Sequence, residues 1–343
     1  MKKLRKKRTL LGDIQNLVKQ VRTGLARTVN NTMVATYFEI GRLIVEDEQE
    51  GKYRAEYAKE TLKNLSEQLT KEFGMGFSVD NLENMRRFYL TYAEGSILQP
   101  TEKSETVSRI SRTPFKLSWS HYVFLMRLSD DERRFYEIES AEQNWSLREL
   151  ERQFDSSLYE RLALSRNKAK VKELSQKGHL ITKPQDLIKE PYVLEFLGLP
   201  EHESLSENDL ESAIIGKVEH FLKELGKGFL FVKRQQRISF NEDHFYIDLI
   251  FYNRILRCFV LIDLKIGKLK HQDIGQMQMY VNYYDRKIKS PNENKTIGIV
   301  LCKSNNKTVV EFTLPKEQPQ IFSSEYRLVL PSKTEFIRQL KNI

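Results

Sequence analysis

The strongest constraint on the fold is a pair of apolar segments separated by a short turn, "HFYIDLIFYN" (244–253) and "LRCFVLIDLKIG" (256–267). Both segments are rich in β-branched and aromatic residues, which favour buried strands. The pattern predicts further elements on either side: a helix at 210–226, a strand at 228–240, a helix at 273–288 and strands at 295–304 and 308–314. This order predicts an α/β domain in which helices pack on a mixed sheet.

Charged residues interrupt this apolar pair. If the turn is centred between Ile255 and Leu256, Asp248 lies directly opposite Asp263 and their Cβ atoms are about 5 Å apart. Lys265 lies on the same face as Asp263, because side chains alternate along a strand. The other face is apolar and is predicted to pack in the core through Ile247, Leu249, Phe251, Val260, Ile262 and Leu264.

Two carboxylates this close repel each other unless a cation binds between them. Mg²⁺ or Mn²⁺ suits a site that is built from carboxylates. Such an ion polarises a phosphoryl oxygen and lowers the pKa of a bound water. Lys265 can orient or deprotonate that water, or stabilise charge on the phosphate. The pattern therefore predicts phosphodiester hydrolysis, and the alternative is that the acids only form salt bridges with Lys265 and nearby arginines.

Composition favours a nucleic-acid partner. The chain has 343 residues and a net charge of +9, which fits a polyanion, with nucleic acid before a membrane surface. The alternative is a solvated surface with a small excess of lysine. No apolar run reaches the length of a membrane-spanning helix, and the basic N-terminus lacks the apolar stretch of a secretory signal. The two cysteines lie in apolar segments, which excludes a disulfide framework and predicts a cytoplasmic location.

The N-terminal half is predicted to be helical, with apolar residues at helical spacing in 31–50 and 55–73. Two glycines then break the chain, and Ser78 can cap a new helix that runs to about residue 93. Two helices joined by a short turn resemble a helix-turn-helix. Arg86 and Arg87, predicted to be exposed, are then candidates for contact with DNA or protein. The alternative is a helical scaffold with a basic surface.

Polar segments divide the chain into predicted domains. Residues 95–114 are polar with two prolines, which indicates a linker or a long surface loop. We expect an all-α domain at 1–165, a linker at 166–204 and an α/β domain at 205–343. The basic N-terminal segment "MKKLRKKRTLLG" is either an arm with non-specific affinity for nucleic acid or a disordered end.

The two acids and the lysine resemble a known signature. Asp248, followed after the hairpin by Asp263-Leu264-Lys265, resembles the PD-(D/E)xK nuclease motif. The wider segment 245–285 is similar to the C-terminal domain of the YhcG-like bacterial PD-(D/E)xK proteins, and 37–90 and 143–164 resemble that family's helical N-terminal domain. The resemblance implies a restriction-endonuclease-like αβββαβ core in the second domain, after an all-α first domain.

The resemblance also assigns roles to residues. Asp248 matches the first metal-binding acid, Asp263 the second, which is more often Glu, and Lys265 the catalytic lysine. Glu219 matches a metal-binding acid on the first core helix. Gln276 matches a glutamine on the helix after the lysine strand, where it can contact DNA or water.

The function implied is a metal-dependent endonuclease that hydrolyses DNA phosphodiester bonds in DNA processing, restriction or defence, with Mg²⁺ or Mn²⁺ as cofactor. A second hypothesis is a protein that keeps the nuclease fold and binds nucleic acid without cleaving it. A third is a structure-selective junction resolvase. The helical domain is expected to contact nucleic acid or protein partners, no membrane partner is expected, and the oligomeric state is left open.

Overall fold

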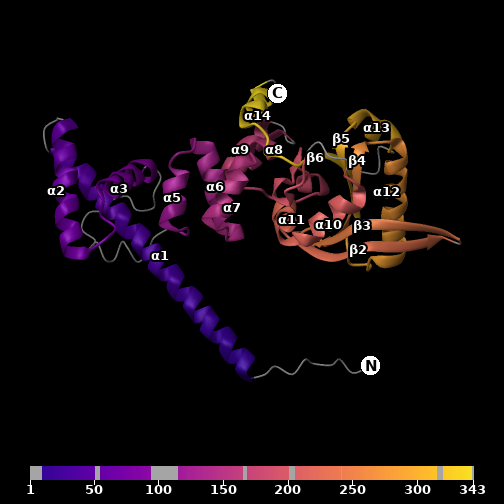
Figure 1. The fold of residues 1–343 in the computed structure, drawn as a ribbon, viewed down its shortest axis with the longest axis horizontal. Helices are drawn as coiled ribbons and strands as arrows, with labels where there is room; N and C mark the ends of the chain where they lie inside the picture. The colour runs from indigo at the N-terminus through magenta and orange to yellow at the C-terminus, as the bar shows by residue number, and fades with distance from the viewer. Residues whose placement is uncertain are drawn as a thin grey trace. The chain divides into compact units, whose positions relative to one another are not determined.

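The computed structural model describes residues 10–50, 55–93, 115–164, 168–200, 205–240, 242–314 and 320–341 (Figure 1). The whole of 95–114, predicted to be a linker or a long surface loop, lies outside these ranges, as does most of the basic N-terminal segment. The chain divides into two compact units. The first comprises Met1–Arg133 and Ser140–Leu147, and the second comprises Arg134–Glu139 and Arg148–Ile343.

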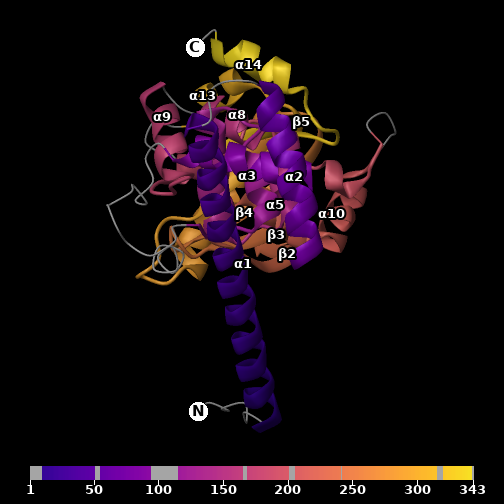
Figure 2. The same ribbon diagram turned by 90° about the vertical axis from the view of Figure 1, so that its left-hand side faces the viewer.

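The first unit consists of helices packed on one long helix. Its elements are α1 (Leu10–Glu50), α2 (Ala55–Phe73), α3 (Val79–Tyr92) and α5 (Trp119–Leu125), together with the two ends of α6 (Asp130–Gln143). Buried side chains of α1 and α3, including Val34, Phe38, Leu82 and Phe88, form the core. The N-terminal part of α1 extends well beyond the other helices of this unit (Figure 2).

The turn between α2 and α3 confirms one prediction and corrects another. Ser78 is the N-cap of α3, where its hydroxyl accepts a hydrogen bond from the Asn81 N–H. Arg86 is not freely exposed, because its guanidinium lies 2.7 Å from the carboxylate of Glu48. Arg87 is exposed, as predicted, but donates a hydrogen bond of 3.0 Å to the Met126 carbonyl. Both arginines therefore have internal partners.

The second unit combines helices with one sheet. Its remaining helices are α7 (Leu147–Asp155), α8 (Leu158–Leu164), α9 (Lys168–Lys177), α10 (Glu207–Gly216), α11 (Val218–Leu225), α12 (His271–Tyr283), α13 (Lys307–Thr313) and α14 (Lys333–Lys341). Short helical turns lie at Pro184–Leu187 and Glu195–Leu197, and a π-helical turn follows α12 at Tyr284–Ile288. Among the described residues, no helix is long and apolar enough to cross a membrane.

The sheet is mixed, as predicted. It contains β1 (Tyr192–Val193), β2 (Phe229–Phe240), β3 (Asp243–Asn253), β4 (Cys258–Lys268), β5 (Ile297–Ser304) and β6 (Ile321–Arg327), in the order β1-β6-β5-β4-β3-β2. Strands β2, β3 and β4 are antiparallel, whereas β4, β5, β6 and β1 are parallel. The prediction of a strand at 308–314 is wrong, because this segment forms the helix α13. Asn306 caps the start of α13 by accepting a hydrogen bond from the Val309 N–H.

Helices cover both faces of the sheet. Leu249, Phe251 and Ile262 belong to one apolar cluster, which also contains residues of α10 and α11. Residues such as Ile250 and Leu261, on the opposite face, pack with α12 in a second cluster. Ile247 joins this second cluster, contrary to the prediction that it shares a face with Leu249.

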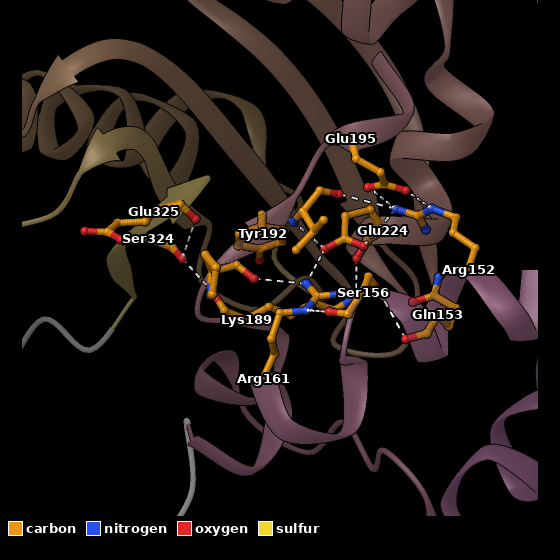
Figure 3. Close-up of polar contacts among 12 residues, drawn as sticks. Arg152, Gln153, Ser156, Arg161, Lys189, Tyr192, Glu195, Glu224, Ser324 and Glu325 are labelled. Atoms are coloured by element: carbon orange, nitrogen blue, oxygen red, sulfur yellow. Dashed lines mark hydrogen bonds and ion pairs between the residues drawn. The ribbon is translucent and has the colours of Figure 1, made fainter. Parts of the chain in front are cut away.

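A buried ionic cluster joins α7 and α8 to the sheet (Figure 3). Glu224 on α11 is its centre, and its Oε1 atom lies 2.6 Å from Nη1 of Arg161 and accepts the Val193 N–H at 3.0 Å. Arg152 contributes a second guanidinium, with Nη2 3.4 Å from Oε2 of Glu224. The side chain of Lys189 is also buried and donates to the Glu224 carbonyl. Through these contacts, α7 and α8 pack as part of the second unit.

Candidate active site

The hairpin of β3 and β4 has the predicted register. Leu249 pairs with Ile262 and Ile250 with Leu261, and the pairing ends there, one residue before Asp248 and Asp263. The Oδ2 atom of Asp248 accepts a hydrogen bond of 2.8 Å from the Leu264 N–H. This bond fixes the Asp248 carboxylate against the middle of β4, at the residue that follows Asp263.

Asp263 and Lys265 form a close ion pair. Asp263 is 2% exposed, and its Oδ2 atom lies 2.8 Å from Nζ of Lys265. Burial, followed by the negative charge of Asp248, raises the pKa of Asp263 to about 7, although Lys265 acts in the opposite direction. Burial lowers the pKa of Lys265, but the carboxylates of Asp263 and Glu207 outweigh burial and raise this pKa overall. Lys265 is therefore a stable ammonium group at neutral pH.

Two residues that the sequence does not single out extend this cluster. Gln235 on β2 has a left-handed backbone (φ 46°), and its Nε2 atom donates to Oδ1 of Asp248 at 3.1 Å. The same amide donates to the carboxylate of Glu211, which is buried on α10. Backbone strain in a residue other than glycine is typical of functional sites. The strained backbone of Gln235 thus places one amide between the two carboxylates.

The structure does not bring Glu219 to this cluster. The sequence pattern treats 210–226 as one helix, but the helix is broken at Lys217, so that α10 ends at Gly216 and α11 begins at Val218. Glu219 is exposed on α11. The acids of the first core helix that face the cluster are Glu211 and also Glu207, whose Oε2 atom lies 3.5 Å from Nζ of Lys265.

Gln276 reaches the cluster through a tyrosine. Its amide donates to the hydroxyl of Tyr280, one turn later on α12, and this hydroxyl donates at 2.7 Å to the carbonyl of Tyr246 on β3. Burial raises the pKa of Tyr280, and the charges of Asp263 and Asp248 raise it further. Tyr280 therefore stays protonated and links Gln276 to the backbone of β3 two residues before Asp248. In the sequence, the contact between Gln276 and Tyr280 is indicated only by their spacing of four residues on one predicted helix.

Comparison with known proteins places the chain in a family. Residues 185–341 match the model of the YhcG PDDEXK nuclease domain, and residues 13–161 match that of the DUF1016 N-terminal domain. A protein of Escherichia coli (strain K12) named "Putative nuclease YhcG" is 38% identical over 345 residues, which cover 95% of this chain and 92% of the relative. The chain belongs to the YhcG family of PDDEXK nucleases.

Two solved structures show weaker likeness. A repair endonuclease from Pyrococcus abyssi is 16% identical over 39% of this chain and 50% of its own, with a TM-score of 0.25. A complex described as EndoMS-dsDNA2 is 15% identical over 39% of this chain and 51% of its own, with a TM-score of 0.26. The mixed sheet of the second unit and the family model establish the restriction-endonuclease-like fold of this YhcG-family chain.

The donor set of the YhcG-family site fits a small oxygen-binding cation. Within the described ranges, no group of three or more His, Cys, Asp or Glu side chains is placed to hold a metal ion. The pair Asp248 and Asp263 supplies two carboxylates, and Mg²⁺ is usually bound by one or two carboxylates together with water and substrate phosphate. The Oδ2 atom of Asp263 lies 2.8 Å from Nζ of Lys265, so a bound cation would share this carboxylate with the Lys265 ammonium group.

Proposed function

We propose that this protein is a metal-dependent endonuclease that hydrolyses DNA phosphodiester bonds at Asp248, Asp263 and Lys265. The observation that carries the proposal is the convergence of these side chains at one end of the β3–β4 hairpin. Membership of a nuclease family supports the reaction class. The proposal takes Mg²⁺ as the ion, with Mn²⁺ as a substitute.

The residues of the chain have distinct roles in this proposal. Asp248 and Asp263 would hold the cation, which supplies Lewis-acid activation when it is bound. Gln235 and the Leu264 N–H orient the Asp248 carboxylate. The raised pKa of Lys265 keeps its ammonium group charged. This charge favours stabilisation of negative charge on the phosphate over proton abstraction from water.

The β2–β3 ribbon supports a nucleic-acid substrate. Its outer residues Lys233, Arg234 and Arg237 are exposed, and Tyr246, paired with Arg237, is 47% exposed. Tyr246 precedes Asp248 by two residues, a separation of about 7 Å along a strand. The paired ends of β2 and β3 extend past the other strands (Figure 1). Cations along this ribbon could bind phosphates next to the one that is cleaved.

The decisive experiment is a cleavage assay with labelled duplex, single-stranded and branched DNA, and RNA, in Mg²⁺, Mn²⁺ or EDTA. We expect cleavage of DNA in Mg²⁺, no cleavage in EDTA, and loss of cleavage in Lys265→Ala. The matched control is Lys287→Ala, an exposed lysine in the turn that begins with Tyr284. Cleavage that survives both EDTA and Lys265→Ala would refute the proposal. Strong preference for the branched arm would instead favour a junction resolvase.

The second candidate function is binding without cleavage. The observation that favours it is the ion pair of Asp263 with Lys265, which already neutralises one of the two proposed metal ligands. Binding of DNA in Ca²⁺, with no cleavage of any substrate in Mg²⁺ or Mn²⁺, would support this candidate and exclude the first.

A further inference from the structure

The ammonium group of Lys265 lies between two carboxylates from different elements. Its Nζ atom is 2.8 Å from Oδ2 of Asp263, on the same strand β4, and 3.5 Å from Oε2 of Glu207, the first residue of α10. The charges of both carboxylates favour the charged form of the ammonium group. Lys265 therefore has a near partner in Asp263 and an alternative partner in Glu207.

Local contacts fix the start of α10, and so the position of Glu207. The hydroxyl of Ser206, the N-cap, accepts the Asp209 N–H at 3.1 Å, and the Asp209 carboxylate accepts the Ser206 N–H at 2.9 Å. Three residues after Glu207, Leu210 packs in the same apolar cluster as Leu264 of β4. The cap and this packing together hold the first turn of α10 beside β4.

The two partners of Lys265 differ in how much they need its charge. Asp263 is 2% exposed and experiences the negative charge of Asp248. An ionised Asp263 is thus poorly solvated and repelled by a neighbour. The side chain of Glu207 is 44% exposed, and ion pairs at such positions contribute little to stability. The pairing of Lys265 with Asp263 is therefore the more favourable of the two in this structure.

A cation bound by Asp248 and Asp263 would reverse this preference. It would share Asp263 with the ammonium group, so that two positive charges would lie close together where the side chain of Lys265 is only 17% exposed. Like charges repel most strongly where the surroundings are least polar. Lys265 can relieve this repulsion by turning towards Glu207, whose carboxylate lies 3.5 Å from Nζ.

We propose that Glu207 is a positioning residue that accepts Lys265 from Asp263 when the cation binds. This role rests on the proposed function, because it needs a cation at Asp248 and Asp263. Glu207 acts only through Lys265 and contacts neither the cation nor the substrate. Without Glu207, Lys265 would keep Asp263 as its partner and compete with the cation for that carboxylate. With Glu207 present, the ion pair of Asp263 and Lys265 does not prevent the site from binding metal.

A double-mutant cycle tests this role through metal affinity, which does not require cleavage. The full chain is titrated with Mn²⁺ in a calorimeter in the absence of DNA. We expect Glu207→Gln to weaken Mn²⁺ binding about tenfold, an effect typical of residues that position metal ligands. In the Lys265→Met background the same substitution should change the affinity by less than about twofold, because no ammonium group competes for Asp263.

Two control variants show that the titration reports the intended site. Asp248→Asn removes one of the two proposed ligands and should weaken Mn²⁺ binding strongly. Glu242→Gln removes the same charge as Glu207→Gln, but in the exposed turn between β2 and β3, and should leave the affinity unchanged. Near-ultraviolet circular dichroism of Glu207→Gln should match the wild type, because the altered side chain is partly exposed and Ser206 still caps α10.

Equal weakening by Glu207→Gln in both backgrounds would overturn the proposed role, because Glu207 would then act on the cation itself. No weakening in either background would also overturn it, and would leave Glu207 and Lys265 as an ordinary ion pair. Both results leave the proposed function intact, because Mn²⁺ still binds. A wild-type chain that binds no Mn²⁺, or binding that Asp248→Asn does not weaken, would instead overturn the proposed metal site and with it the role of Glu207.

Discussion

Replacement of Glu224 by Gln tests whether the buried ionic cluster holds the second unit together. The Glu224 carboxylate lies 2.6 Å from Arg161, and the side chains of both residues are 0% exposed. Gln has nearly the same shape but carries no charge. The variant therefore leaves Arg161 and Lys189 buried without their shared counter-charge, whereas Arg152 keeps Glu195 at 2.7 Å.

The expected loss of stability follows from this geometry. Removing one member of a buried ion pair costs about 3–5 kcal/mol, because the remaining charge is poorly solvated. For a unit of this size, each kcal/mol lowers the unfolding temperature by about 2–4 °C, so we expect a decrease of about 6–20 °C. Differential scanning calorimetry measures this decrease. The control is Glu219→Gln, the same change at an exposed position of the same helix, which should cost less than about 0.5 kcal/mol.

The pH dependence gives an independent check. Although burial raises the pKa of Glu224, the charges of Arg161, Lys189 and Arg152 lower it to about 2, from an ordinary value of 4.5. A depressed carboxyl pKa contributes stability above the unfolded value, and this contribution is lost as pH falls from 4.5 towards about 2. Wild type and Glu224→Gln should thus differ most above pH 4.5 and converge in acid. A difference below about 1 kcal/mol at pH 7, or one no larger than in the Glu219 control, would refute the reasoning.

Four further substitutions test other parts of the structure. In the proposed substrate ribbon, Arg237→Ala should weaken DNA binding in Ca²⁺ and reduce the slope of log affinity against log salt by about 0.9, measured by fluorescence anisotropy across a salt series. Glu211→Gln should slow cleavage by at least about tenfold, whereas Glu219→Gln should not, because only Glu211 shares the Gln235 amide with Asp248. Gly41→Ala should destabilise the first unit by about 1–3 kcal/mol in thermal unfolding, because an added Cβ would overlap the Met85 backbone carbonyl. Gly24→Ala, with no neighbour within 4 Å, should instead stabilise α1.

Features that depend on residues close together in the sequence could be predicted. The alternation of apolar residues and the position of the turn fix the register of β3 and β4. Asp248 and Asp263 follow directly after the last pair of this register, and Asp248 accepts the N–H of Leu264. The cap at Ser78 is likewise a local feature. The roles of Asp248, Asp263 and Lys265 in catalysis, and the cytoplasmic location, stay predictions.

Features that depend on contacts between residues far apart in the sequence could not be predicted. Strand β6 is not predicted from the sequence, because the buried residues Ser323 and Ser324 interrupt its apolar pattern. The amphipathic pattern of 210–226 gives no sign of the break at Lys217, which depends on tertiary contacts, and the metal-binding role that the resemblance gives Glu219 stays a prediction. The predicted linker at 166–204 contains β1, which pairs with β6 more than 130 residues later, and its role as a domain boundary stays a prediction.

The buried ionic cluster limits how this protein can exchange parts with its relatives. The blocks that match the two family models end at 161 and begin at 185, yet Arg152 and Arg161 in the first block hold Glu224 in the second. A chimaera joined between these blocks would combine guanidinium groups from one parent with a carboxylate from the other. Such a hybrid would be stable only if one parent supplies the two arginines and the other supplies the glutamate. A junction near Leu147 would instead keep Arg152, Arg161 and Glu224 in one block from a single parent.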